Sequence, residues 1–170
     1  MSKTDKFLKE SVNYSTEDSQ FMEMAIKLSI ENIDSGGGPF GAVIVRNGEI
    51  ISTGTNRVVP NADPTAHAEI MAIRKACSKL GTFQLTGCTI YSSCEPCPMC
   101  LSALYWAGVS RICYGCTKHD AKAIKFDDSF IYDQLELNYE ERSIKCEHYM
   151  RSEALKAFRK WEEKEDKVRY

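Results

Sequence analysis

The chain has 170 residues, of which 43% are hydrophobic and 27% charged, and its 22 basic and 24 acidic side chains leave a net charge of −2. This length and composition predict one soluble globular domain over residues 1–170, with enough apolar surface to form a core without metal or disulfide support. No apolar run reaches the roughly 18 residues needed to cross a bilayer, so a membrane protein is excluded. The chain also has no overall excess of the positive charge that attracts proteins to nucleic-acid backbones.

The cysteine content bears on the cellular compartment. Eight cysteines are present, and the first ten residues lack the uninterrupted apolar stretch of a secretory signal. In a chain of this size without such a signal, cysteines are better interpreted as reduced thiols, some of them on a metal, than as disulfides. We therefore expect a cytoplasmic protein.

The first predicted elements are a helix and a hairpin. Ser15 is a capping residue followed by two acidic residues and an apolar stripe at helical spacing, which predicts a helix that ends before three consecutive glycines. Residues 42–46 and 49–52 flank the dipeptide Asn47-Gly48. Because this dipeptide accepts the positive φ angles of a type I′ turn, the segment predicts a β-hairpin.

Helices and strands then alternate. Residues 66–80 predict a helix with one apolar face, stopped by Gly81, and residues 88–92 predict a short strand. Residues 97–107 predict an apolar helix, and residues 111–115 predict a strand buried on both faces. This order favours an α/β fold with mostly parallel late strands and a ligand site at the carboxyl ends of those strands.

Two short motifs carry the chemistry. His67-Ala68-Glu69 is followed, after 26 further residues, by Pro96-Cys97-Pro98-Met99-Cys100, and together they supply an imidazole, two thiolates and a carboxylate. A structural zinc is closed by four protein ligands, whereas a catalytic zinc keeps three and leaves one position to water. We therefore predict that His67, Cys97 and Cys100 bind one zinc ion and that Glu69 moves protons beside it.

A different zinc site is also conceivable from the cysteine spacing. Cys97, Cys100, Cys113 and Cys116 are spaced as in a four-cysteine structural zinc ribbon. The intervening residues 101–112 have core character, and two cysteines three apart on a strand point to opposite faces, so we favour the catalytic site. The ribbon would belong to a zinc-stabilised interaction module with no position left for water.

The chain resembles the cytidine deaminase-like superfamily over nearly its whole length, and most closely the bacterial-type guanine deaminases. The blocks that carry the resemblance are 38–45 with Asn56, 63–69, 93–100 and 126–132. The resemblance implies a three-layer α/β/α fold with a central mixed five-stranded sheet. It also implies hydrolysis of guanine to xanthine and ammonia, in which zinc-bound hydroxide attacks C2 of the base.

The resemblance further assigns individual roles. Glu69 would be the proton shuttle, and Asp128 would contact the guanine amine or help to protonate the departing ammonia. The resemblance implies that Phe40, Asn56, Asp128 and Tyr170 bind the substrate. We also expect Ala68 and Trp106 at the substrate site, with Trp106 as part of an apolar slot for the purine ring. Phe40 would wall the purine ring and Asn56 would hydrogen-bond to it, as expected of an apolar slot with a few polar groups. Tyr170 would close the pocket, unless the chain end is simply frayed.

The C-terminal segment suggests a partner. Residues 151–170 predict a helix and tail, with Leu155, Phe158 and Trp161 on one face. The resemblance implies a homodimer in which these segments pack on, or are exchanged with, the neighbouring subunit. One departure from the family pattern is Lys125, which occupies the position of a glycine before Phe126-Asp127-Asp128 and would strain the loop if that position needs a positive φ.

Two alternative activities remain open at this point. Guanosine deamination would require a larger pocket but the same mechanism. A tRNA adenosine deaminase shares the first three blocks and the metal site, but it must bind a folded RNA loop and extrude its base. The acidic charge balance weighs modestly against the tRNA substrate.

Overall fold

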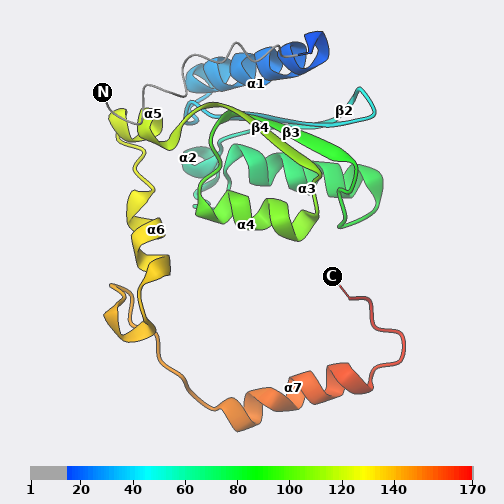
Figure 1. Cartoon of the computed structure of the whole chain (residues 1–170), viewed down its shortest axis with the longest axis vertical. Coiled ribbons are helices and arrows are strands. Elements are labelled where there is room, and N and C mark those ends of the chain that lie inside the picture. Colours follow the sequence, from blue (N-terminus) through cyan, green and yellow to red (C-terminus); the bar gives the residue numbers. More distant parts are fainter. Residues whose placement is uncertain (1–14, 170) are drawn as a thin grey trace.

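The computed structural model describes residues 15–169, and Figure 1 shows how they are arranged. The strands are β1 (Gly41–Arg46), β2 (Glu49–Thr55), β3 (Cys88–Cys94) and β4 (Arg111–Cys116). The helices are α1 (Thr16–Asp34), α2 (Val58–Asn61), α3 (Ala68–Leu80), α4 (Pro98–Ala107), α5 (Lys118–Ala123), α6 (Ser129–Glu136) and α7 (Arg151–Glu163), with a 3-10 helix η2 at Tyr139–Glu141. Helix α1 covers one face of the sheet and helices α3 and α4 cover the other (Figure 1), which confirms the predicted three-layer α/β/α architecture.

The local predictions for the first elements are confirmed. The Ser15 side chain accepts a hydrogen bond from the Asp18 amide at 3.0 Å and so caps α1. Asn47 and Gly48 adopt φ angles of 51° and 76°, and they join the antiparallel strands β1 and β2 as the turn chemistry requires. Strand β3 pairs antiparallel with β1 and parallel with β4, so the sheet is mixed, in the order β2-β1-β3-β4.

Two expectations about the sheet are wrong within residues 15–169. The sheet has four strands rather than five, and β4 is an edge strand rather than a strand buried on both faces. Tyr114 in β4 remains 49% exposed because β4 has a single neighbouring strand. The outer edge of β4 therefore keeps backbone groups that are able to pair with another strand.

The alternation of side chains along β1 divides the core between the two faces of the sheet. Ala42 and Ile44 pack on the side of α3 and α4, whereas Val43 and Val45 pack on the side of α1. Helix α3 packs very closely against β2 at Gly54. A Cβ atom at this glycine would lie only 2.0 Å from the Ala68 carbonyl oxygen. This contact brings the start of α3 to the end of β2.

A polar cluster ties α1 to β3 and β4. Arg111 donates two hydrogen bonds to the Asp18 carboxylate, at 2.8 and 3.1 Å, and the Tyr91 hydroxyl donates to the same carboxylate. The Arg111 hydrogen bond, followed by that of Tyr91, lowers the pKa of Asp18 from 3.8 to about 2. The Asp18 side chain is only 19% exposed, so solvent screens this cluster less than an ordinary surface ion pair.

We expect Asp18→Asn to lower the free energy of unfolding at pH 7 by about 2 kcal/mol, because it weakens charge-assisted hydrogen bonds. Folding lowers the pKa of Asp18, so its stabilising contribution is complete above about pH 4 and is lost as the pH falls towards 2. Urea unfolding of both proteins at several pH values measures the difference. If the difference in free energy of unfolding between the two proteins does not decrease at acid pH, the proposed role of the ionised Asp18 is contradicted. Glu31→Gln is a suitable control, because it removes only the exposed Lys27–Glu31 pair.

The C-terminal part of the chain leaves the globular body. Figure 1 shows α6 and α7 following one another along an arm, with α7 well apart from the sheet and its covering helices. Apolar side chains on this arm are exposed, including Tyr149 at 84%, Phe158 at 70% and Trp161 at 43%. Among residues 15–169, no helix has both the length and the apolar character needed to cross a membrane.

Candidate metal centre and active site

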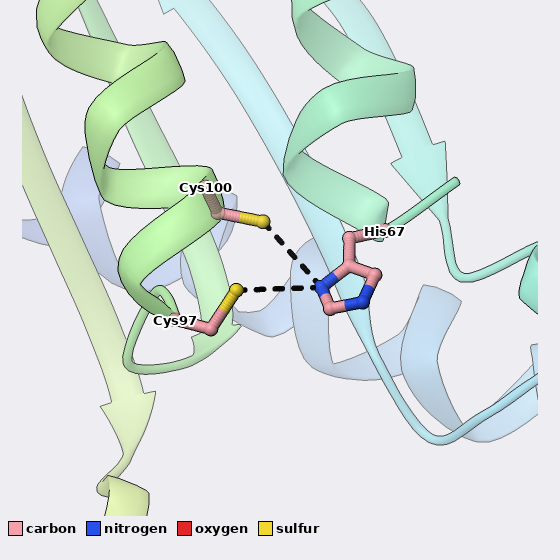
Figure 2. Close-up of side chains that lie close together, drawn as sticks. All are labelled: His67, Cys97 and Cys100. Carbon is pink, nitrogen blue, oxygen red and sulfur yellow. Dashed lines mark hydrogen bonds between the residues drawn. The ribbon is translucent and has the colours of Figure 1, made fainter. Parts of the chain in front are cut away.

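The two sequence motifs converge at the start of two neighbouring helices. His67 is the N-cap of α3, Cys97 is the N-cap of α4, and Cys100 lies in the first turn of α4. Figure 2 shows their side chains pointing toward one another, with His67 Nδ1 3.5 Å from each cysteine Sγ. The three ligand atoms lie within 4.8 Å of one another. One imidazole and two sulfurs at this separation fit the protein ligands of a catalytic zinc site.

The four-cysteine alternative is not supported by this geometry. Cys113 and Cys116 lie on β4 and do not belong to the group formed by His67, Cys97 and Cys100, which is the metal-binding group found among residues 15–169. Cys116 is instead exposed at the end of the edge strand. The structural zinc ribbon predicted as a rival is therefore wrong.

Electrostatics prepares Cys97 to bind a metal. Hydrogen bonds from the Cys100 thiol and, to a smaller extent, from His67 lower the pKa of Cys97 to about 4. The pKa of Cys100 is raised, because its thiol donates a hydrogen bond to Cys97 and is buried. The positive ends of helices also favour thiolates, so the start of α4 holds negative charge where a cation would bind.

Glu69 is in contact with the metal-binding group through Cys100. It is 6% exposed, and its carboxylate oxygens are 3.5 Å from Cys100 Sγ and 3.5 Å from Ser92 Oγ, both of which can donate to it. Burial raises the pKa of Glu69, because water no longer solvates the charged form. A buried carboxyl group with a raised pKa is suited to accept and return a proton.

Two members of the metal-binding group, His67 and Cys97, line a cavity of about 450 Å³ together with Glu69. The lining residues are Gly38, Phe40, Asn56, Val58, Val59, His67, Glu69, Cys94, Glu95, Cys97, Lys118, Ala121, Lys125, Phe126, Asp127, Asp128 and Ile131. Phe40 and Phe126 form an edge-to-face pair with ring centroids 5.0 Å apart. Burial raises the pKa of Asp128. The structure thus brings the predicted Phe40, Asn56 and Asp128 to the same cavity as Glu69.

Two predicted substrate-binding residues do not line the cavity, and a third lies outside residues 15–169. Trp106 is 65% exposed and lines a separate apolar hollow with Phe83, because it lies nine residues beyond Cys97 on α4, about 13 Å along the helix. The Ala68 methyl group is fully buried in the core on the α3 side of the sheet and does not line the cavity. Tyr170 lies outside the described residues.

Several lining residues were not predicted from the sequence. Glu95 follows the carboxyl end of β3, which is the usual position of ligand-binding residues in parallel sheets, so its place in the chain was a usable signal. Its carboxylate accepts a hydrogen bond from the Lys118 amide at 3.0 Å. Lys118 also lies over the Tyr132 ring at 4.6 Å. The block 126–132 had indicated the start of α6, whereas no sequence pattern indicated that α5 would border the cavity.

Lys125, which also lines the cavity, has a φ of 70°. The left-handed conformation costs a residue with a Cβ atom about 1–2 kcal/mol, and glycine recovers part of this at an entropic cost in the unfolded chain. The predicted strain at this family glycine position is therefore confirmed. The turn is held by the Lys125 amide, which donates to the Lys122 carbonyl at 3.0 Å.

Lys125→Gly is accordingly expected to raise the free energy of unfolding by about 0.5–1 kcal/mol, as measured by chemical denaturation. The same substitution at Lys27, an exposed residue within α1, is the matched control and should instead destabilise the protein by about 1 kcal/mol. Destabilisation by both substitutions would show that the turn carries no relievable strain.

The site agrees with comparisons to known proteins. Residues 15–116 match the family model described as the cytidine and deoxycytidylate deaminase zinc-binding region. A guanine deaminase of Bacillus subtilis is 48% identical over 151 residues, which are 88% of this chain and 97% of the relative. A crystal structure of guanine deaminase from that organism superposes with a TM-score of 0.87, at 47% identity and coverage of 89% of this chain and 98% of the other.

More distant relatives show the breadth of the same group. A tRNA-specific adenosine deaminase of Aquifex aeolicus is 38% identical over 136 residues, which are 79% of this chain and 86% of the relative. A guanine deaminase structure from Nitrosomonas europaea has a TM-score of 0.63 at 33% identity, covering 86% of this chain and 74% of the other. With the metal-binding group and its neighbouring glutamate in place, this chain belongs to the cytidine and deoxycytidylate deaminase family of zinc-binding enzymes.

Proposed function

We propose that the chain catalyses the zinc-dependent hydrolytic deamination of guanine to xanthine and ammonia. The observation that carries this proposal is that a group of three metal ligands and the buried Glu69 adjoin a cavity that is also lined by aromatic rings, an amide and further carboxyl groups. The extent and identity of the match to the Bacillus subtilis guanine deaminase support guanine as the substrate.

The metal and Glu69 have different roles in the proposed reaction. Zinc held by His67, Cys97 and Cys100 supplies a water of lowered pKa and therefore a nucleophile at neutral pH. Glu69 would hold the proton released by the attacking water and would deliver it to the ring nitrogen beside C2 as the water oxygen bonds to that carbon. A second proton, from the hydroxyl now bonded to C2, would pass through Glu69 to the amine, so that this hydroxyl becomes the carbonyl of xanthine as the C2–N bond breaks and ammonia leaves.

The cavity walls orient the base. Phe40 presents an apolar surface for the purine ring, and its edge-to-face contact with Phe126 ties it to the loop that carries Asp128. The Asn56 Oδ1 atom accepts from the amides of Gly38 at 3.4 Å and Val58 at 3.3 Å, so the amide N–H groups of Asn56 are left to donate to the purine. Asp128 is the carboxyl group available to the exocyclic amine.

Ammonia release by the zinc-loaded protein tests this function. Guanine, guanosine, adenine, cytosine and a tRNA substrate are compared at equal metal content, and guanine is expected to be the preferred substrate. Preference for guanosine would keep the mechanism and change the substrate. Activity on tRNA alone, with steep salt dependence, would replace guanine by the tRNA substrate.

We further propose a cytoplasmic homodimer that exchanges its C-terminal segments. All eight cysteines are free thiols, as expected in a reducing compartment. The outer edge of β4 is unpaired within residues 15–169, and α7 exposes Phe158 and Trp161. Residues 145–149, which belong to no helix or strand, have the length to add a fifth strand to the β4 edge of a second copy, and α7 would then cover apolar surface there. In this arrangement Tyr170 closes the neighbour's cavity.

Mixed dimers test the exchange with full-length chains. Glu69→Ala has a defective site and an intact tail, whereas Tyr170→Ala has an intact site and a defective tail. Refolding the two variants together should restore activity if the intact tail of one subunit serves the intact site of the other. Mixed dimers that stay as inactive as the separate variants would contradict the exchange, and a monomeric mass in light scattering would contradict the dimer.

A further inference from the structure

Asn32, near the end of α1, is a buried polar residue that lies next to the active site without lining it. Its side chain is 4% exposed, and it is absent from the walls of the catalytic cavity. The Asn32 Nδ2 group donates to the Gly38 carbonyl at 2.8 Å and to the Asn56 carbonyl at 2.8 Å. Both amide hydrogens of one side chain therefore hold the backbone of two cavity-lining residues.

The glycine-rich loop after α1 is shaped around this side chain. The Gly37 amide donates to the Asn32 carbonyl at 3.0 Å. A Cβ atom at Gly37 would lie 2.2 Å from Asn32 Nδ2 and 2.3 Å from the Asn56 carbonyl oxygen. Only glycine permits such a close approach, so the loop runs directly over the Asn32 amide.

The residues held by Asn32 are connected to those that face the purine. The Gly38 amide donates to Asn56 Oδ1, which sets the orientation of the Asn56 side chain. The Asn56 amide donates to the Phe40 carbonyl at 3.1 Å. A displacement of the Gly38 or Asn56 backbone is thus transmitted to both the amide and the aromatic ring of the substrate site.

We propose that Asn32 is a positioning residue for purine binding, which acts through Gly38 and Asn56 and does not touch the substrate. The inference rests on the proposed guanine deaminase function. Its physical basis is that removal of the Asn32 amide takes the side-chain donor from the Asn56 carbonyl and leaves the Gly38 carbonyl with the Phe40 amide alone, so that the loop relaxes. Misplacement of a substrate-orienting group by about 1 Å can cost on the order of 100-fold in rate.

Asn32→Ala is expected to lower kcat/KM for guanine by about 10–100-fold, mainly through KM, with zinc content per chain unchanged. Ser29→Ala is the matched control, because Ser29 is also buried on α1 but donates only to the Ile26 carbonyl within the helix, at 2.7 Å. Asn32→Ser removes less volume and serves if the alanine variant folds poorly. If Asn32→Ala or Asn32→Ser lowers thermal stability but leaves kcat/KM per zinc-loaded chain unchanged, Asn32 has a purely structural role. That result would overturn the proposal.

A double-mutant cycle with Asn56→Ala separates positioning from a direct effect. If Asn32 acts through Asn56, the loss caused by Asn32→Ala should shrink to about twofold or less in the Asn56→Ala background. An equal loss in both backgrounds would overturn the proposal. The cycle uses kcat/KM for guanine with each variant loaded with zinc.

Amide hydrogen exchange provides a readout that needs no substrate. The Gly38 and Val58 amides, which donate to Asn56 Oδ1, should exchange about tenfold faster in Asn32→Ala than in Ser29→Ala. Unchanged exchange of these amides would contradict the proposal that Asn32 holds the loop, even if activity fell. If the wild-type protein does not deaminate guanine, the proposed function fails, whereas the exchange rates still decide whether Asn32 holds the loop.

Discussion

Glu69→Ala is expected to lower guanine turnover by about 10²–10⁴-fold while the protein retains one zinc ion per chain. Glu69 is not one of the three metal ligands, so its removal leaves the metal-binding group intact. The carboxyl group is buried and lies 3.5 Å from the sulfur of Cys100, so it is the proton carrier adjacent to the metal-binding group. The variant therefore separates proton transfer from metal binding.

The measurement combines ammonia release with metal analysis of the same samples. Glu69→Gln is a second variant that preserves the shape of the side chain and removes its ability to titrate. Glu49→Gln, at an exposed position in the hairpin, controls for the loss of one acidic side chain. Near-normal turnover by Glu69→Ala would remove Glu69 from the mechanism.

Cys97→Ala should abolish both zinc binding and turnover, with a loss of zinc affinity of more than about 100-fold. Removal of a residue that only orients a metal ligand already costs about 10–100-fold in affinity or activity, and Cys97 is itself a ligand in the predicted set. Folding should survive, because the core on both faces of the sheet is formed by side chains that do not depend on the metal. The effect on stability is therefore expected to be smaller than the effect on metal content.

Cys113→Ala is the matched control for this loss. Cys113 lies on β4 outside the metal-binding group and packs against the core on the α1 side. Equilibrium dialysis with zinc and activity assays should show that Cys113→Ala retains both properties. Loss of zinc from Cys113→Ala together with Cys97→Ala would revive the four-cysteine site.

The features that depend on residues close together in the sequence were predicted correctly. The helix capped by Ser15 and the hairpin at Asn47-Gly48 follow from local backbone preferences, which act within a few residues. The convergence of His67 with Cys97 and Cys100 was also predicted, because helix starts that follow strands meet at one edge of an α/β sheet. The left-handed Lys125 was anticipated from a departure from the family pattern.

Features that depend on which elements become neighbours were not predictable in the same way. An apolar strand sequence such as that of β4 is compatible with a central or an edge position, because side-chain pattern does not report strand order. Trp106 was expected to form part of an apolar slot for the purine, but the axis of α4 carries it away from the metal-binding group. The positions of Glu95, Lys118 and Phe126 in the cavity wall depend on the paths of the loops after β3 and β4, which only the structure shows.

The sequence by itself determined the chemistry of this protein, because metal ligands and a proton carrier must be specific residue types at spacings that place them at helix starts. Only the tertiary structure decided the shape of the substrate cavity and the clamp formed by Asn32. The physical reason is that Asn32, Gly38 and Asn56 are joined by side-chain hydrogen bonds to backbone groups, and such bonds leave no periodic signal along the chain.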